Sequence, residues 1–335
     1  MSENIQYWQV AAGDAGRDYA KEFIRYGVAF VGGTAFERMM KEEVKVGHRI
    51  LIKKGKGTIH AAGAVVAREG RHNGHGDKAW MRDLDGWDLP AYCYVDWHVP
   101  PAPMPAPEGL AISTLSRVGV PALVALCDSI IHDHPIRPHE PEPEPGKELE
   151  DEQLIDQLII HGLSIGSAEG LSDALRRIRR LVNYYYHNEH WRDVREHETR
   201  TFLVVPLLLS LGWPEQCIKI EEPVKGGRMD LALYDKPYFH TDARCQVIIE
   251  TKGFSEGLQY ASDQASAYAE HHPDCRTILV TNGFCYKAHR RKTDGYRTSV
   301  PDAYLNLRDP RDRHALYPDA GGALEVLKML LRTGG

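Results

Sequence analysis

The sequence has no long apolar run, no paired cysteines and no secretory leader. No apolar stretch approaches the roughly 20 residues needed to cross a bilayer, and the opening residues lack the basic start and apolar centre of a signal peptide. The six cysteines are scattered, without the C-x-x-C spacing of a zinc site and without the pattern of a disulfide framework. We therefore expect a cytoplasmic protein with reduced thiols and no membrane contact.

An excess of basic residues is also missing. The chain has 41 Lys and Arg against 47 Asp and Glu, a formal net charge of −6, whereas a nucleic-acid-binding surface needs a basic footprint. The charges are unevenly placed, however. Residues 139–156 are strongly acidic, Arg176, Arg177, Arg179 and Arg180 cluster on one predicted helix, and residues 289–292 read HRRK. The arginine cluster either contacts phosphates or forms the solvated face of its helix.

The length of 335 residues predicts about two domains. The boundary is a run of alternating Glu and Pro at residues 136–150, which has too little apolar surface to fold compactly and should be an extended, semi-rigid spacer. We expect a first domain at residues 1–135 and a second at residues 151–335. In the second, residues 151–161 and 171–187 are predicted to be helical.

Two predicted strands in the second domain carry the chemistry. They are residues 229–234 and residues 246–252, joined by a polar loop. Side chains alternate along a strand, so Glu250 and Lys252 share one face. If the strands pair, Asp230 lies beside Glu250, and two carboxylates and an ammonium occupy one small space.

This arrangement suits metal-assisted hydrolysis. Two adjacent carboxylates repel each other unless a cation lies between them or one keeps its proton. Mg²⁺, or Mn²⁺ in its place, takes oxygen ligands and leaves positions for water and phosphate. It can polarise a phosphodiester and acidify a water molecule, while Lys252 orients the water or neutralises developing charge. The alternative is a partly exposed ion pair on a hairpin, worth about 0–1 kcal/mol.

The flanking segments contain further motifs in a fixed order. They are an acidic helix with a TR pair (Glu196, Thr199–Arg200), an apolar helix ending in LGW (Leu211–Trp213), a G-R-x-D strand (Gly227–Asp230), an E-x-K strand (Glu250–Lys252) and a Q-x-x-x-Y helix (Gln264–Tyr268). This order resembles the N-terminal nuclease domain of type I restriction enzyme R subunits, within the PD-(D/E)XK nuclease superfamily. The resemblance covers roughly residues 190–290.

The resemblance implies a restriction-endonuclease-like αβ sandwich with a central mixed sheet. It implies Asp230, Glu250 and Thr251 as metal ligands, and Lys252 as the catalytic lysine. A glutamate of the acidic helix should join the metal site. Glu196 and Glu198 are both available, and the spacing to the TR pair favours Glu196. Gln264 is expected to reach a phosphate or the lysine, unless it is simply a solvated helix residue, and Arg228 is expected to bind substrate.

The first 135 residues predict a small mixed β-barrel with peripheral helices. A YW strand, the hairpin VGHRILI…IHAAGAVV (residues 46–66) and a V-x-W strand at Val95–Trp97 resemble the PUA-like superfamily, in particular EVE and related modified-base readers. The resemblance implies a pocket that accepts a flipped base. Trp8 and Trp97 are the candidates for stacking on it, with Asp83 or Asp85 to bind the base edge, although buried aromatic packing is the alternative for each ring.

Together these observations predict an α/β (α+β) protein with two domains, an N-terminal reader and a C-terminal nuclease. The expected function is Mg²⁺-dependent cleavage of DNA carrying modified bases, as in restriction of foreign DNA. A single site cuts one strand, so a homodimer or two binding events would be needed for a double-strand break. The alternatives are a DNA-binding protein that does not cut, and a first domain that reads RNA or a small nucleotide.

Overall fold

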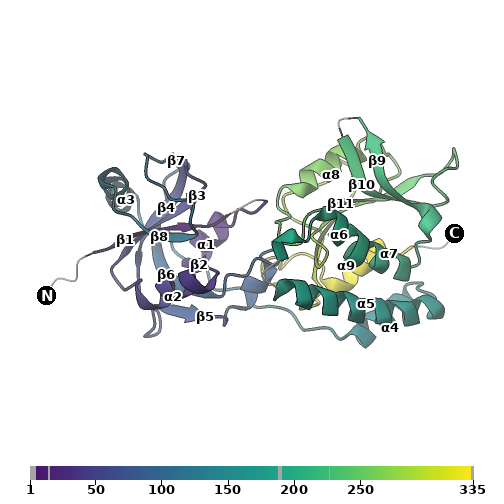
Figure 1. Cartoon of the computed structure of the whole chain (residues 1–335), viewed down its shortest axis with the longest axis horizontal. Coiled ribbons are helices and arrows are strands. Elements are labelled where there is room, and N and C mark those ends of the chain that lie inside the picture. The colour runs from purple at the N-terminus through teal and green to yellow at the C-terminus, as the bar shows by residue number, and fades with distance from the viewer. Residues whose placement is uncertain (1–4, 14–15, 188–190, 226, 333–335) are drawn as a thin grey trace. The chain divides into compact units, whose positions relative to one another are not determined.

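The computed structural model describes residues 5–13, 16–187, 191–225 and 227–332. The chain divides into two compact units, residues 1–142 and residues 143–335, and each is described by itself (Figure 1). None of the helices in these described ranges is long and apolar enough to cross a membrane.

The first unit is built on a curled, mixed sheet. Its strands are β1 (Tyr7–Ala11), β2 (Val28–Val31), β3 (Arg49–Lys54), β4 (Thr58–Val65), β5 (Asn73–His75), β6 (Ala91–His98), β7 (Met104–Pro105) and β8 (Leu115–Arg117). The hydrogen-bonded order is β2-β6-β4-β3-β1-β8, with β5 added to β6 and β7 added to β4. The pair β1–β3 is parallel, and the neighbouring pairs are antiparallel.

Three α-helices pack around this sheet: α1 (Ala20–Tyr26), α2 (Thr34–Glu42) and α3 (Pro121–Asp133). A short 3₁₀ turn, η1 (Ala79–Asp83), brings Trp80 into the interior. Large aromatic side chains fill the core, because alternate residues of each strand point inward. Trp8, Trp80, Tyr92 and Trp97 are almost completely buried there.

The second unit has a six-stranded mixed sheet. Its strands are β9 (Ile218–Val224), β10 (Gly227–Tyr234), β11 (Cys245–Thr251), β12 (Thr277–Thr281), β13 (Cys285–Arg290) and β14 (Ala303–Asn306), in the order β14-β13-β12-β11-β10-β9. Only β11 and β12 run parallel among these pairs, and the helix between them makes the crossover that a parallel pair requires.

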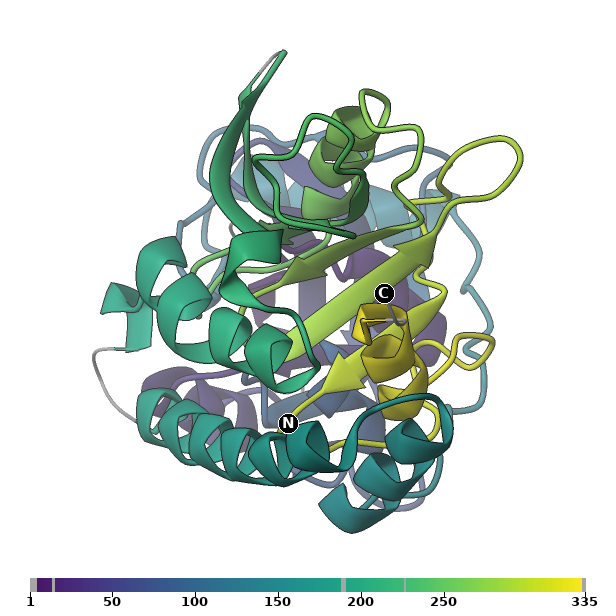
Figure 2. The same cartoon turned by 90° about the vertical axis from the view of Figure 1, so that its right-hand side faces the viewer.

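The helices of the second unit are α4 (Asp151–Ile160), α5 (Ile165–Tyr186), α6 (Glu196–Thr199), α7 (Val205–Ser210), α8 (Ala261–Ala269) and α9 (Ala323–Leu330). Helix α8 packs on β11 and β12, and α9 packs on β13 and β14. Figure 2 shows α8 in light green above the sheet and α9 in yellow below it. The α/β class, with a mixed sheet in each unit, is therefore confirmed.

The acidic helix and the apolar helix expected over residues 196–213 form one interrupted helix. A π-helical turn, η3 (Arg200–Val204), separates α6 from α7. Pro206, in the first turn of α7, has no N–H to donate, and its ring crowds the carbonyl four residues earlier. The regular hydrogen-bond ladder therefore cannot run through this point, and the wider π turn takes its place.

The Glu-Pro segment is extended, as expected, but it is not a free spacer. Its first half is bound to the first unit, where Glu140 pairs with Arg25 and Glu142 pairs with the buried Lys78. Its second half is bound to the second unit, where Arg311 donates to the Gly146 carbonyl at 2.9 Å. Ion pairs and backbone hydrogen bonds compensate for the apolar contacts that this segment lacks, and the division falls between residues 142 and 143.

Gly283 fixes the packing of the interrupted helix against the β12–β13 turn. It has φ +94°, and a Cβ there would lie 2.4 Å from Leu203 Cδ1 and 2.9 Å from Thr199 Cγ2. Gly295 has a similar φ of +102°, but a Cβ there would meet no atom within 4 Å. A substitution at either glycine introduces backbone strain, but only one at Gly283 also introduces steric overlap. Comparing the two therefore separates these costs.

We expect Gly283→Ala to lower the free energy of unfolding by about 1–3 kcal/mol more than Gly295→Ala does, because overpacking adds to the strain of a positive φ. Chemical denaturation of both full-length variants measures this difference. Equal losses of unfolding free energy in the two variants would show that a side chain at residue 283 does not overlap the helix.

Candidate active site

The pairing of β10 with β11 sets the geometry of the site. The register joins Leu231 to Ile249, so one step further along these antiparallel strands Asp230 faces Glu250. Parallel pairing of β11 with β12 continues to Thr251 and Thr281. The Lys252 N–H then donates to the Thr281 carbonyl at 2.8 Å and anchors the end of the strand. The sequence motif is therefore held by main-chain bonds on both sides.

Glu250 and Lys252 lie together, as their spacing predicts. Lys252 Nζ donates to Glu250 Oε1 at 2.7 Å, and only 4% of the Glu250 side chain is exposed, against 19% for Lys252. The second carboxylate oxygen, Glu250 Oε2, is buried and has no hydrogen-bond partner among the residues that the structure describes. A buried acceptor without a donor is costly, and a proton or a cation bound to this oxygen would relieve that cost.

Asp230 is held by its neighbour across the strands. Its Oδ2 accepts hydrogen bonds from the Thr251 N–H at 2.7 Å and the Thr251 hydroxyl at 2.8 Å. This role of Thr251, as a support for Asp230, was not predicted from the sequence. The opposite oxygen, Oδ1, lies 3.6 Å from Arg200 Nη1, so two donors and a cation fix the orientation of the carboxylate.

Arg200 is the site residue that the sequence reasoning missed. It comes from the π turn, is only 4% exposed, and also donates to the Asp230 carbonyl at 3.3 Å. Its Nη2 lies 3.5 Å from Glu221 and 3.3 Å from His197 Nδ1. The TR pair was recognised as a motif, but nothing local distinguishes a buried arginine from a solvated one.

The choice between the two helical glutamates has a geometric answer. Glu196 Oε1 lies 3.9 Å from Lys252 Nζ, on the side of the cluster. Glu198 instead accepts a hydrogen bond from the Arg195 N–H at 3.0 Å and caps its own helix. Because residues two apart on a helix point in different directions, only Glu196 approaches the lysine.

The electrostatics follow from crowding and burial. Burial and the nearby Asp230 raise the pKa of Glu250 to about 7, although Lys252 acts in the opposite direction. Burial also raises the pKa of Glu196. Burial alone would lower the pKa of Lys252, but the hydrogen bond to Glu250 and the surrounding acids raise it. The lysine therefore stays charged at neutral pH, and Glu250 is poised to lose its proton when a cation arrives.

These residues fit a hard divalent cation. Glu250 Oε2 is a buried oxygen without a donor among the described residues, and Asp230 Oδ1 lies 3.6 Å from Arg200 Nη1, beyond hydrogen-bond distance. Mg²⁺ is commonly held by one or two carboxylates, with waters and substrate phosphates completing its shell. No group of three or more His, Cys, Asp and Glu side chains suited to a metal occurs among the described residues. Carboxylate oxygens are ligands that suit Mg²⁺ and Mn²⁺, whereas zinc sites are usually built from Cys and His.

Gln264 and Arg228 lie outside this cluster. Gln264 donates to the Tyr268 hydroxyl at 3.1 Å and makes no hydrogen bond to Lys252 within the described ranges. Arg228 is exposed and pairs with Glu221 at 2.9 Å. Both side chains are open to solvent, so contact with a phosphate stays a prediction for each.

The proposed stacking residues of the first unit are wrong. Trp8 and Trp97 are buried, and their indole N–H groups bond to His48 Nδ1 at 3.1 Å and to the Phe23 carbonyl at 3.1 Å. Asp83 and the alternative Asp85 are buried as well. Both tryptophans occupy inward-facing positions on the sheet, so their rings lie in the core. An indole N–H with a hydrogen-bond partner makes this burial favourable.

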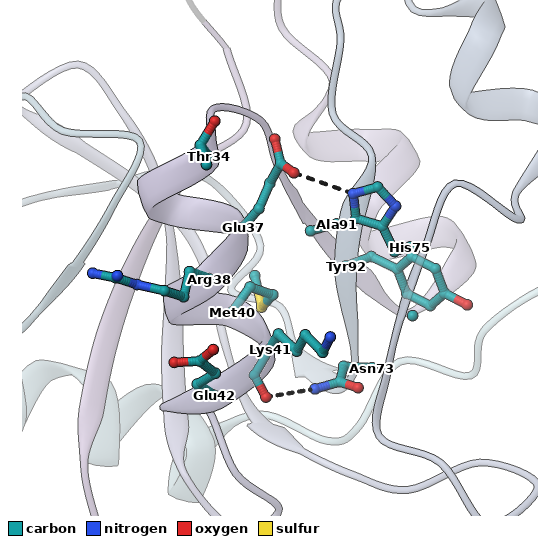
Figure 3. Close-up of a pocket in the computed structure, with 11 residues that line it drawn as sticks. Thr34, Glu37, Arg38, Met40, Lys41, Glu42, Asn73, His75, Ala91 and Tyr92 are labelled. Carbon is teal, nitrogen blue, oxygen red and sulfur yellow. Dashed lines mark hydrogen bonds and ion pairs between the residues drawn. The ribbon is translucent and has the colours of Figure 1, made fainter.

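A different hollow is present in the first unit. A pocket of about 380 Å³ lies between α2 and the strands β5 and β6. Glu37 and His75 pair across it at 3.1 Å, Asn73 lies beside Lys41, and the buried side chain of Tyr92 lines it (Figure 3). The size is within the usual range for small-molecule sites.

Comparison with known families identifies the region that carries the cluster. Residues 195–302 match the family model described as type I restriction enzyme R protein N terminus (HSDR_N). The match runs from just before α6 to just before β14 and includes every residue of the Asp–Glu–Lys cluster. No curated protein and no solved structure matches the chain. The second unit thus contains a restriction-enzyme-like domain, and nothing comparable is found for the first unit.

The raised pKa of Glu250 predicts how stability changes with pH without metal. The folded protein keeps the proton to about pH 7, whereas an ordinary glutamate releases it near 4.5. The folded state therefore binds more protons in this window, and its free energy of unfolding falls as pH rises. We expect Glu250→Gln to be more stable than the natural protein by about 1–3 kcal/mol above pH 7, with the difference fading below pH 5.

Denaturation in EDTA at several pH values tests this expectation. Glu270→Gln, at an exposed acid on the end of α8, is the matched control and should leave stability unchanged. Added Mg²⁺ should stabilise the natural protein and not Glu250→Gln. A less stable Glu250→Gln at pH 8 would contradict the strained carboxylate pair.

Proposed function

We propose that this chain, with its restriction-enzyme-like second unit, is an Mg²⁺-dependent endonuclease that hydrolyses phosphodiester bonds in DNA. The observation that carries the proposal is the pairing of the partly buried Asp230 with the buried Glu250, with Lys252 beside them. These residues lie at the end of the central sheet and inside the matched region. The pattern corresponds to the PD-(D/E)XK nucleases.

Asp230 and Glu250 would hold the ion, with Thr251 as an additional ligand. The bound cation would polarise a phosphate oxygen and acidify an attacking water. The protein's own contribution is to fix the ligands before substrate arrives. Thr251 and Arg200 orient Asp230, and the end of β11 orients Glu250. Little reorganisation is then needed when charge develops at the phosphate.

Lys252 has two tasks in this proposal. Without a cation it neutralises Glu250 at 2.7 Å. If Glu250 binds a cation, the Lys252 ammonium can hold a water molecule or balance the negative charge that develops on the phosphate. Glu196, 3.9 Å away, limits how far the lysine can move. Gln264 and Arg228 would contact the nucleic-acid backbone from the rim.

The biological role that fits best is modification-dependent restriction of foreign DNA, with a PUA-like, EVE-like first unit as the reader. The pocket of Glu37, His75 and Asn73 supports this role, because it offers hydrogen-bonding groups above a buried aromatic floor. One cluster per chain cuts one strand, so a homodimer would cut both. A first unit that reads RNA or a free nucleotide is the second candidate, since the same pocket chemistry would serve it.

A protein that binds DNA without cutting is the alternative from another class. The intact cluster speaks against it. A site that no longer cut DNA would gain stability by losing the buried Glu250, because one of its carboxylate oxygens lacks a hydrogen-bond partner among the described residues.

Removal of either charge partner should abolish cutting. We expect Asp230→Asn and Lys252→Met each to lower Mg²⁺-dependent nicking of DNA by at least about 10²-fold, because the ion loses a ligand or the developing charge loses its cation. A plasmid nicking assay measures the rates, and circular dichroism checks the fold. Asp319→Asn, at an exposed acid, should cut normally. Full activity of both cluster variants would end the proposal.

The reader pocket makes its own prediction. We expect the full-length protein to bind a duplex with methylated or hydroxymethylated bases more tightly than the unmodified duplex. Glu37→Ala should reduce this preference by about 1–3 kcal/mol, the cost of an unpaired polar group in a pocket. Fluorescence anisotropy without divalent ions measures both affinities. Glu108→Ala, an exposed acid of the first unit, is the control. A preference that survives Glu37→Ala would place the reading elsewhere.

A further inference from the structure

A second cavity lies at the other end of the central sheet of the second unit. Its volume is about 880 Å³, and Val247, Thr277 and Arg290 line it. These three residues are aligned across β11, β12 and β13, and Thr251, Thr281 and Tyr286 are aligned four residues away on the same strands. At ~3.3 Å per residue the two ends are about 13 Å apart. The cavity is therefore separate from the Asp–Glu–Lys cluster.

The lining of this cavity is strongly basic. It contains seven cations, Arg244, Arg276, Arg290, Arg291, Lys292, Lys328 and Arg332, and a single acid, Asp235. Some cations pair with carboxylates just outside: Arg244 with Asp274, Lys292 with Asp302, and both Arg290 and Lys328 with Glu325. Seven cations against these four acids leave an excess of three positive charges.

Three of these arginines have no carboxylate partner within the described ranges of the chain. Arg276 is exposed, and its guanidinium has no hydrogen-bond or ion-pair partner in the part of the chain that the structure describes. Arg291 donates to three backbone carbonyls, and Arg332 donates to the Asp235 carbonyl at 3.2 Å. Carbonyl bonds fix the last two guanidinium groups in place without neutralising them. The cavity therefore presents preorganised positive charge.

Beneath the cations the cavity has an apolar floor. Trp213, Val247, Met329 and Leu331 line it and are buried. The Trp213 N–H donates to the Leu330 carbonyl at 2.6 Å, which holds the ring in one orientation. A ligand that fits must therefore combine a flat or apolar part with several negative charges.

We propose that this cavity binds a nucleoside polyphosphate, a ligand class unrelated to the DNA that the cluster would cut. Guanidinium groups bind phosphates with paired hydrogen bonds, and a base and sugar would lie on the apolar floor. The volume is within the range of small-ligand sites. Helices α8 and α9 pack on the strands that join the two ends of the sheet.

Binding of ATP to the full-length protein tests the proposal. A fluorescent ATP analogue is titrated in EDTA at about 50 mM salt, where screening is weak. We expect saturable binding that ATP displaces at least about tenfold better than AMP, because it carries more phosphate charge. Arg276→Glu and Arg244→Glu should each weaken binding by at least about tenfold. Both side chains are exposed, and thermal unfolding confirms that the variants are folded.

Two controls isolate the cavity. Arg176→Glu reverses a charge on an exposed arginine of α5 and should leave the affinity unchanged. Asp230→Asn should also bind normally, which separates this site from the nuclease and keeps the two proposals independent. The proposal fails if no saturable binding appears up to about 1 mM, or if Arg276→Glu binds as well as the natural protein. It also fails if oligothymidylate, and not ATP, is the ligand that Arg276→Glu loses.

Discussion

Repulsion between two carboxylates is the constraint around which the second unit is organised. Asp230 and Glu250 are brought together by strand pairing at a place that little water reaches. Each needs positive charge or hydrogen-bond donors to stay there. Thr251 and Arg200 satisfy Asp230, whereas Glu250 has Lys252 on one oxygen and nothing on the other. This buried carboxylate oxygen of Glu250 is the observation on which the proposed cation site depends.

The interrupted helix explains how a buried arginine reaches this site. Glu196 and Arg200 are four residues apart, so one helical face carries both toward the sheet. The π turn that begins at Arg200 widens the backbone there, upstream of Pro206, and π turns often occur at functional sites. Gly283 lets the β12–β13 turn pack closely on the same segment. The interrupted helix is therefore irregular in its hydrogen bonding, but close packing holds it in position.

The central sheet also separates charge along its strands. One end carries the carboxylates of the cluster, and the other carries the arginines of the basic cavity. This explains how a chain with a net charge of −6 can still have surfaces that attract anions. Within the Glu-Pro segment, the charges of Glu140 and Glu142 are balanced by Arg25 and Lys78. The local placement of charged residues, and not the net charge of the chain, determines where anions are attracted.

The sequence by itself determined the class of the fold, the two strands of the cluster and the association of Glu250 with Lys252. These depend on local periodicity and on strand alternation, which neighbouring residues specify. Only the tertiary structure shows that Glu196, and not Glu198, approaches Lys252. It also shows that Arg200 is buried beside Asp230 and that Trp8 lies in the core and not in a pocket. The basic cavity also needed it, because its basic residues come from four segments that are distant in the sequence. Burial and long-range contact depend on how elements pack, and no local pattern encodes that.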